Sequence, residues 1–576
     1  MDKSNIGFSW VACGSGTGSR VRSADARALI ACAAIAVISG GFSSVVNASP
    51  SGIGLTGIPT NLTGAGVNIG QVEASTSSAG SGTQSSPYQA TFEVSTPAAG
   101  PVVTYIGDAP SDYYPTSPGA SAPGSQPNVD TTTGVLHTFT VNSSSSYYQY
   151  GVSAHANSVA SNLWGTNGVA PGVSYVDNYS ANWFLSSVVG TYYSTGVNKF
   201  APVNTLHGDS IINQSFTSTF PASDTAQQQL QEEQQLNLEY DAYSNYYGTL
   251  FVSAVGDGAT TNSNSTVSLA VNPPSTAYNS ISVSASALAA NNATNGPTLT
   301  GLSSPDIIAP GQYSSYSTPL VSGAAALLVQ AGNNMANTNA VQAQTVKALL
   351  MNGADKADNW APSAGNSLNQ NVGAGSLDVY QSYQNLEAGQ HAAAAVNSSS
   401  TPITVGTADP LEGWDFSAAS STRNNVSHYL LNLPAAAIAG HLTATLVWNA
   451  QTSLSYGHIV GTSLYGLAGA SSEAFNSLYL YLYNATTGAL VSKSTSTNDN
   501  TQTIFTSLTS LTPGDQYDLQ VFDAGYQGST PAGFTLNTSD PYALAWNVVA
   551  TPEPAALLLL ACGMLPLMMR RKSVRA

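Results

Sequence analysis

Hydrophobic and polar positions change their spacing along the chain and so mark two folded regions. From residue 135 to 385, short apolar runs alternate with helical patterns, which predicts βα units and a parallel sheet. An apolar run at 66–74 adds a strand, and the clearest helical pattern starts near Asp224, a plausible N-cap residue. Residues 76–134 are rich in Ser, Pro, Gly and Thr, and we interpret them as a long insertion with little helix.

The second region, residues 403–550, alternates strictly between apolar and polar positions. Leu442, Ala444 and Leu446 share one face of a predicted strand, and the runs are separated by turn residues. This pattern predicts an all-β sandwich of seven or eight strands, joined to the first region by a linker at 386–402. The sequence therefore predicts an α/β domain over 49–385, with a parallel sheet flanked by helices, followed by an all-β sandwich domain.

The first 48 residues have the pattern of a secretory signal peptide. Four basic residues precede an apolar run from Ala28 to Ile38, and small residues at Val46-Asn47-Ala48 suit cleavage. The alternative, an N-terminal membrane anchor, is disfavoured because the apolar run is too short.

The last segment, residues 551–576, combines three features in order: TPEP, a 15-residue apolar stretch that predicts a short membrane helix, and RRK. A helix of that length rises about 22 Å, less than a membrane core of about 30 Å. The segment resembles a PEP-CTERM sorting tail, and a plain tail anchor is the alternative. The resemblance implies export in a Gram-negative bacterium, removal of the tail by exosortase-type sorting machinery, and a final place in the cell envelope or outside the cell.

Charge and cysteine content narrow the possible functions. Only 7% of the residues are charged and the net charge is −17. The basic residues between 49 and 550 are only Lys199, Lys347, Lys356, Arg423 and Lys493, so a nucleic-acid binder is excluded. The three cysteines, Cys13, Cys32 and Cys562, all lie in the end segments, which leaves no disulfide or cysteine nucleophile in the folded part. We expect a monomer without a cofactor.

The segment 304–332, SPDIIAPGQYSSYSTPLVSGAAALLVQAG, carries the strongest sign of chemistry. A strand ending in Ala-Pro-Gly leads through a turn to a helix of small residues, with Ser315 at its start. A helix N-terminus presents free N–H groups, so a serine there has an oxyanion donor in its own N–H. The segment resembles the nucleophile block of the subtilisin-like serine proteases, the subtilases, in which Ser315 is the nucleophile. Tyr313 and Ser314 replace the Gly and Thr of that family.

Other blocks resemble the same family in the same order. The segment 153–176, SAHANSVASNLWGTNGVAPGVSYV, is similar to the histidine block and implies that His155 is the general base. The strand at 67–75 is similar to the family's first strand, with Glu73 in place of its aspartate. The resemblance implies that Glu73 orients the imidazole. Glutamate is one methylene longer, and an uncompensated shift near 1 Å costs roughly 10²-fold in rate. A surface glutamate at a strand end is the alternative.

Two further positions follow from the resemblance. Asp257 stands where the family has its oxyanion-hole asparagine. A protonated Asp257 would donate to the oxyanion, as in the related sedolisins, and this implies a narrow, mildly acidic optimum. The segment 210–216 resembles the substrate-pairing strand, so Ser215, Phe216 and Thr217 are predicted to bind substrate. His207 just before it is interpreted as a surface histidine.

These resemblances imply a secreted serine endopeptidase that hydrolyses protein or peptide substrates through Glu73, His155 and Ser315. One alternative is a catalytically degenerate surface protein that binds peptide or matrix, favoured by Asp257 and the Tyr313-Ser314 pair. Another is a structural, exopolymer-associated protein in which the sandwich is the working part. The sequence specifies no metal site. The family implies that structural calcium would be compatible with the spare carboxylates, but the sequence does not place it.

Overall fold

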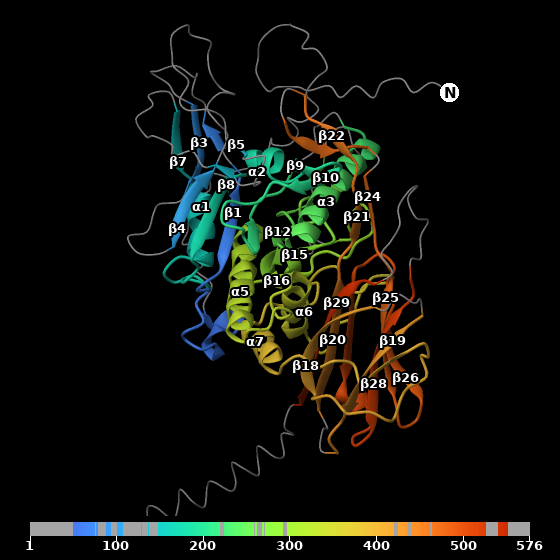
Figure 1. Ribbon diagram of the computed structural model, residues 1–576. Helices are drawn as coiled ribbons and strands as arrows, with labels where there is room; N and C mark the ends of the chain where they lie inside the picture. The colour runs from blue at the N-terminus through green and yellow to red at the C-terminus, as the bar shows by residue number, and fades with distance from the viewer. Residues whose placement is uncertain are drawn as a thin grey trace, which may run out of the picture.

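The computed structural model describes the greater part of the chain between the two end segments (Figure 1). The described residues are 50–74, 76–78, 88–93, 101–106, 128–129, 136–137, 148–218, 224–258, 260–261, 268–269, 271–291, 296–419, 424–435, 439–460, 463–469, 471–525 and 539–550. The predicted signal peptide and sorting tail lie outside them, and so does most of the predicted insertion. Export, sorting and the final location therefore stay predictions. No helix among the described residues is long and apolar enough to cross a membrane.

A seven-stranded sheet forms the centre of the first domain, and every neighbouring pair in it is parallel. Its order is β16-β15-β12-β11-β1-β8-β4. The strands are β1 (Asn68–Glu73), β4 (Val102–Ile106), β8 (Tyr175–Ser180), β11 (Ile211–Gln214), β12 (Leu250–Ala254), β15 (Ser280–Ala285) and β16 (Ile307–Ala309). The edge strand β4 belongs to the segment predicted as an insertion, so part of that segment extends the sheet.

Helices cover both faces of this sheet, because the apolar side chains of each strand point alternately to either side. One face packs against α1 (Ala154–Leu163), α5 (Ser314–Asn334), α6 (Ala343–Gly353) and α7 (Val379–Glu387). The other packs against α2 (Ala181–Ser187) and α3 (Ala226–Tyr247). In β1, Ile69 belongs to the first core and Val72 to the second, as alternation requires. The short helix α4 (Ser286–Ala290) follows β15.

The long helix α3 begins one residue later than predicted. Thr225 is the N-cap residue, and its side chain accepts from the backbone N–H of Gln228 while the Gln228 side chain bonds back to the Thr225 N–H. This reciprocal capping box satisfies two donors that would otherwise lack a partner. The prediction of Asp224 as the N-cap is therefore wrong, because the Thr-x-x-Gln pattern one residue on makes the better cap.

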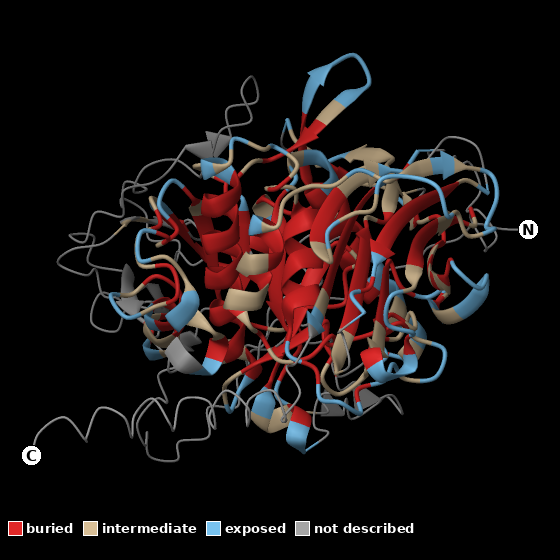
Figure 2. Ribbon diagram, turned by 90° about the horizontal axis from the view of Figure 1, so that it is seen from below, coloured by how far each residue is buried: buried red, intermediate tan, exposed pale blue. Residues whose placement is uncertain are grey.

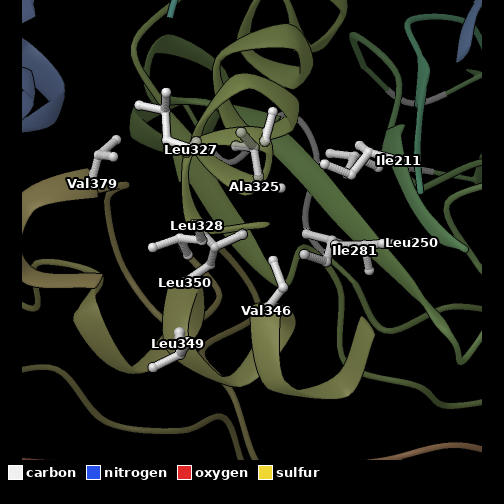
Figure 3. Packing of buried hydrophobic residues seen from close by; sticks show 14 of the residues in the cluster. Ile211, Leu250, Ile281, Ala325, Leu327, Leu328, Val346, Leu349, Leu350 and Val379 are labelled. Atoms are coloured by element: carbon white, nitrogen blue, oxygen red, sulfur yellow. The ribbon is translucent and has the colours of Figure 1, made fainter. Parts of the chain in front are cut away.

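The main core lies between the sheet and helices α5 and α6. Figure 3 shows Ile211, Leu250 and Ile281, from three successive strands of the sheet, facing this helix layer. Leu328 of α5 and Leu350 of α6, also labelled in Figure 3, belong to the same core. Helix α5 is rich in small residues, and its buried Ala324, Ala325 and Ala326 let the helix lie close to the strands. In Figure 2 these inner helices are buried along nearly their whole length.

Residues after 394 form the predicted sandwich, with two antiparallel sheets of five and four strands around one core. The first sheet contains β17 (Ala395–Asn397), β19 (Val426–Asn432), β28 (Gln516–Asp523), β25 (Leu478–Asn484) and β26 (Ala489–Ser494). The second contains β18 (Glu412–Ala418), β29 (Pro541–Ala550), β20 (Gly440–Trp448) and β27 (Thr501–Ser507). The sheets hold more strands than the seven or eight predicted, partly because β17 forms inside the segment interpreted as a linker.

Smaller elements complete the described structure. They are the helical turns η1 (Pro50–Ile53), η2 (Leu55–Gly57) and η4 (Leu508–Ser510), and the strands β2 (Thr76–Ser78), β3 (Tyr88–Glu93), β5 (Asn128–Val129), β6 (Leu136–His137), β7 (Tyr148–Val152), β9 (Thr191–Gly196), β10 (Lys199–Pro202), β13 (Thr260–Thr261), β14 (Ser268–Leu269), β21 (Gln451–Ser453), β22 (Tyr456–His458), β23 (Tyr465–Leu467) and β24 (Ser472–Ala474). Strands β9 and β10 of the first domain and β22 and β23 of the sandwich share one four-stranded sheet.

The two domains are joined by a continuous interface. Trp414 and Val447 of the sandwich belong to the same apolar core as helices α5 and α6. Asp499, 1% exposed, accepts hydrogen bonds from the backbone N–H of Ser303 (2.6 Å) and Ser367 (2.8 Å) and from the Ser303 hydroxyl (3.0 Å). The sandwich therefore packs as an extension of the α/β domain, with little freedom to move as a separate module.

Candidate active site

The predicted site residues come from five segments, and four of these end or follow strands of the parallel sheet at one edge, while His155 lies at the start of α1. Glu73 ends β1, residues 215–217 follow β11, and Asp257 lies three residues after β12. Ser315 follows β16 through a short turn. Because parallel strands have their carboxyl ends at the same edge, these side chains gather where ligands bind in open α/β sheets.

Glu73 and His155 form a direct contact. His155 Nδ1 lies 2.8 Å from Glu73 Oε2, and the Glu73 carboxylate is 1% exposed, whereas the His155 side chain is 24% exposed. His155 sits in the first turn of α1, where the hydroxyl of the N-cap residue Ser153 accepts from the Ala156 N–H. The helix start thus holds the imidazole at the sheet edge with one ring nitrogen toward Glu73 and the other left for a further partner.

The surroundings of His155 change its acidity. Burial alone would lower the pKa of the imidazole, but the Glu73 carboxylate raises it through its charge and its hydrogen bond, and Asp257 adds to the increase. The net result is a His155 pKa above its ordinary value of 6.5. The protonated imidazole is therefore stabilised, which is the state a general base reaches during proton transfer.

The start of α5, which carries Ser315, lies next to His155 because α1 and α5 pack against each other. The ring of Tyr316, the next residue, lies 5.5 Å from the His155 ring at 32°. The Asn162 side chain of α1 donates to the Tyr316 carbonyl at 3.1 Å. The segment that follows α1 lies directly against α5 because Gly323 faces Val169, and a Cβ at Gly323 would lie 2.5 Å from the Val169 Cβ. No hydrogen bond joins the described side chains of His155 and Ser315. Such bonds are often long in unliganded enzymes.

Ser315 is the second residue of α5, so its backbone N–H belongs to the first turn, where no intrahelical acceptor exists. That N–H is free to face a developing negative charge. The turn before it is held by Ser317, whose hydroxyl donates to the carbonyls of Ala309 and Pro310, both at 3.1 Å. Gly311 is needed here, because a Cβ would lie 2.4 Å from the Ser317 hydroxyl.

Asp257 lies at the same helix start, where its side chain is bound to Ser314. Its Oδ1 accepts from the Ser314 N–H at 2.7 Å and from the Ser314 hydroxyl at 2.8 Å, and the Ser314 hydroxyl accepts from the Gly256 N–H at 3.2 Å. Asp257 is exposed, and Ser314 is buried. The role of Asp257 as an oxyanion donor stays a prediction.

The predicted substrate-binding residues are mostly turned into the protein. Ser215 and Phe216 are buried, and Phe216 packs in the core beneath α2 and α3. Asn213 donates to the Ser215 hydroxyl at 3.0 Å. Of these three residues, only the half-buried Thr217 can contact a ligand with its side chain. Ser215 and Phe216 can contact it only through their backbone groups.

His207, interpreted from the sequence as a surface histidine, lies before β11 and thus at the opposite edge of the sheet. Its Nδ1 contacts Asp177 Oδ1 at 2.6 Å, and its ring stacks on Tyr175 at 4.1 Å. It takes no part in the candidate site. No group of three His, Cys, Asp or Glu side chains in the described part of the chain is arranged to hold a metal ion. Structural calcium stays an untested expectation.

Sequence reasoning missed Gln71, which reaches Glu73 from two residues earlier on β1. Its Nε2 donates to Glu73 Oε1 at 2.9 Å. The alternation of a strand places residues 69, 71 and 73 on one face, so a polar residue at 71 in an apolar strand was the available sign.

Comparison with known proteins supports a protease fold. Residues 137–375 match the subtilase family model, a stretch that includes His155, Asp257 and Ser315 but not Glu73. No curated protein matches the chain. The match supports a subtilase-type domain and a serine protease in general.

Solved structures similar to this chain include two proteases. The patellamide maturation protease PatA is 16% identical, with a TM-score of 0.29, over 56% of this chain and 97% of that one. A protease from Pseudoalteromonas arctica is 14% identical, with a TM-score of 0.30, over 58% of this chain and 94% of that one. Identities and TM-scores this low assign no residue roles.

Proposed function

We propose that this protein is a serine endopeptidase in which Ser315 is the nucleophile, His155 the general base and Glu73 the residue that orients His155. The observation that carries the proposal is the 2.8 Å contact of His155 with the buried Glu73, next to the helix start that bears Ser315. The subtilase match over 137–375 supports the same reaction class.

The geometry suggests how each residue acts. With Nδ1 of His155 bound to Glu73, Nε2 is the nitrogen that takes the proton from the Ser315 hydroxyl as its oxygen attacks the peptide carbonyl. Glu73 stabilises the imidazolium so formed. The Ser315 N–H donates to the oxyanion, and the imidazolium then protonates the leaving amine. Water, activated by the same imidazole, releases the acyl group.

The acidity of His155 sets the pH range of this reaction. The base must be neutral, and its pKa is raised above 6.5, so activity is lost as the pH falls through the raised value. We therefore expect a neutral to alkaline optimum, in contrast to the mildly acidic optimum that a protonated Asp257 would imply. An optimum below pH 6 would contradict this assignment.

A second candidate function is a peptide-binding surface protein on a degenerate protease fold, and Asp257 favours it. An exposed carboxylate that accepts hydrogen bonds at the start of α5 adds negative charge where an oxyanion would form. Loss of one oxyanion donor alone costs about 2.7–4 kcal/mol in enzymes that have two.

Covalent labelling separates the two candidates. The purified protein is treated with a fluorophosphonate serine probe from pH 4 to 9, beside Ser315→Ala and, as a matched control, Ser314→Ala. We expect labelling that increases with pH and is abolished only by Ser315→Ala. A folded protein that takes up no probe at any pH would support the binding protein and refute the enzyme.

A further inference from the structure

Behind the Glu73–His155 pair lies a chain of buried side chains that the proposed reaction does not itself require. The Trp164 indole Nε1 donates to Gln71 Oε1 at 2.8 Å. Gln71 Nε2 donates to Glu73 Oε1 at 2.9 Å and to the Ala156 carbonyl at 3.1 Å. Trp164 is 3% exposed and Gln71 is fully buried.

The orientation of the Gln71 amide is determined by its partners. An indole nitrogen is only a donor, so the Gln71 carbonyl oxygen must face Trp164. The two hydrogens on Nε2 then match the two acceptors beside it, the Glu73 carboxylate and the Ala156 carbonyl. Every polar group of the amide is thus used, and the opposite flip would place like groups together at both ends.

These hydrogen-bonded side chains restrain the Glu73 carboxylate, which is one methylene farther from the backbone than an aspartate carboxylate would be. A longer side chain has one more rotatable bond, so a carboxylate held only at Oε2 by His155 could turn about its axis. Gln71 holds the second oxygen, Oε1, and so fixes the plane of the carboxylate. Because Gln71 also bonds to the carbonyl of Ala156, the residue after His155, one amide positions both the carboxylate and the turn that carries the imidazole.

We propose that Gln71, held in place by Trp164, is a positioning residue that allows a glutamate to orient His155. The proposal rests on the function proposed above. Gln71 touches no reacting atom and stays neutral throughout, so its effect is on geometry and on the charge balance of the Glu73–His155 pair.

The test compares Gln71→Met with Gln330→Met. Gln330 is a matched control because it is also a buried glutamine, with its Oε1 accepting from the N–H groups of Thr63 and Gly64, both at 2.7 Å. It lies 15 residues along α5 from Ser315, roughly 22 Å away. Both variants lose the hydrogen bonds of a buried side-chain amide, but only Gln71→Met loses a hydrogen bond to Glu73.

We expect Gln71→Met to lower kcat by about 10²-fold with a KM within about 2-fold of the parent, because a misplaced base impairs the chemical step. The acidic limb of kcat/KM should move to lower pH as Glu73 stabilises the imidazolium less well. Trp164→Phe, which removes the indole N–H donor together with part of a buried ring, should lower kcat and shift the acidic limb in the same direction and by less. Gln330→Met should lower the melting temperature and leave kcat and the limb unchanged. If the acidic limb of kcat/KM lies at the same pH in Gln71→Met and in the parent protein, the proposal is overturned.

A second readout does not depend on activity. In protein with isotope-labelled histidine, the His155 resonance, assigned with His155→Gln, is titrated by NMR in the parent and in both variants. We expect a lower His155 pKa in Gln71→Met or Trp164→Phe and no change in Gln330→Met. If the parent protein does not react with the serine probe, the proposed enzyme fails, and this titration still decides whether Gln71 positions the pair. An unchanged His155 titration in both Gln71→Met and Trp164→Phe would refute the inference.

Discussion

Replacement of Asp257 by asparagine tests the electrostatics at the start of α5. In the present structure Asp257 Oδ1 holds both donors of Ser314. An asparagine carbonyl oxygen can accept the same two bonds and place its NH₂ group where Oδ2 now lies. The substitution therefore keeps the local packing, removes a negative charge and adds a donor near the start of α5.

The expected gain follows from the contribution of one oxyanion donor, about 2.7–4 kcal/mol, or roughly 10²–10³-fold in kcat. A second effect concerns His155, since Asp257 is one of the groups that raise its pKa. Removal of that charge should move the acidic limb of kcat/KM to lower pH, by less than about one unit because Asp257 is exposed to solvent.

The assay measures kcat and kcat/KM for a chromogenic peptide from pH 5 to 10 in the parent, Asp257→Asn and Asp358→Asn. Asp358 is the control because its side chain is 98% exposed. A higher kcat and an acidic limb at lower pH in Asp257→Asn, with no change in Asp358→Asn, would support the role of the Asp257 charge at the start of α5. If Asp257→Asn instead loses activity at every pH, then Asp257 itself takes part in the reaction, and the reasoning above is refuted.

Two further predictions concern stability. Burial and the nearby Asp241 charge raise the pKa of Glu473, and burial raises the pKa of Asp241 to about 6, so the folded pair holds a proton that the unfolded chain releases above about pH 4. The contribution of this pair to the stability of the fold is therefore present at acidic pH, and it is lost as the pH rises through the pKa values of the folded state. Glu473→Gln should make the unfolding free energy, measured in urea, fall less between pH 5 and 8 than it does in the parent protein, and parallel curves would contradict this. Asp499→Ala should cost about 2–4 kcal/mol and lower the unfolding midpoint of both domains together, because it leaves two buried N–H donors unpaired at their interface. Asp358→Ala is the control, and separate transitions in the parent protein would show that the interface does not couple the domains.

Much of the fold could be predicted because it depends on local patterns. The apolar runs of β11, β12 and β15 and the alternation at Leu478–Leu482 are visible without tertiary information, and they determine which faces are buried. The strand β4 was not predicted, although its five residues, Val102–Ile106, are all β-branched or aromatic. The turn-forming composition on either side masked this short run, and its pairing with the edge of β8 makes it part of the sheet.

The candidate site likewise has features that the sequence shows and features that depend on tertiary packing. The residue types and the order of Glu73, His155 and Ser315 are properties of the sequence, as is the presence of Asp257 near a strand end. Their relation in space depends on the packing of α1 and the segment after it against α5, where Gly323 meets Val169, a residue far away in the chain. No local pattern encodes that approach.

The sequence alone therefore determined the fold class and the chemical groups available to the protein, because hydrophobic periodicity and residue identity are local properties. Only the tertiary structure decided that the longer Glu73 reaches His155, that Gln71 and Trp164 hold it, and that Asp257 is exposed and bound to Ser314. These contacts join residues up to 93 positions apart. They exist because packing of the whole sheet against its helices brings the carboxyl ends of its strands and the starts of those helices to one edge.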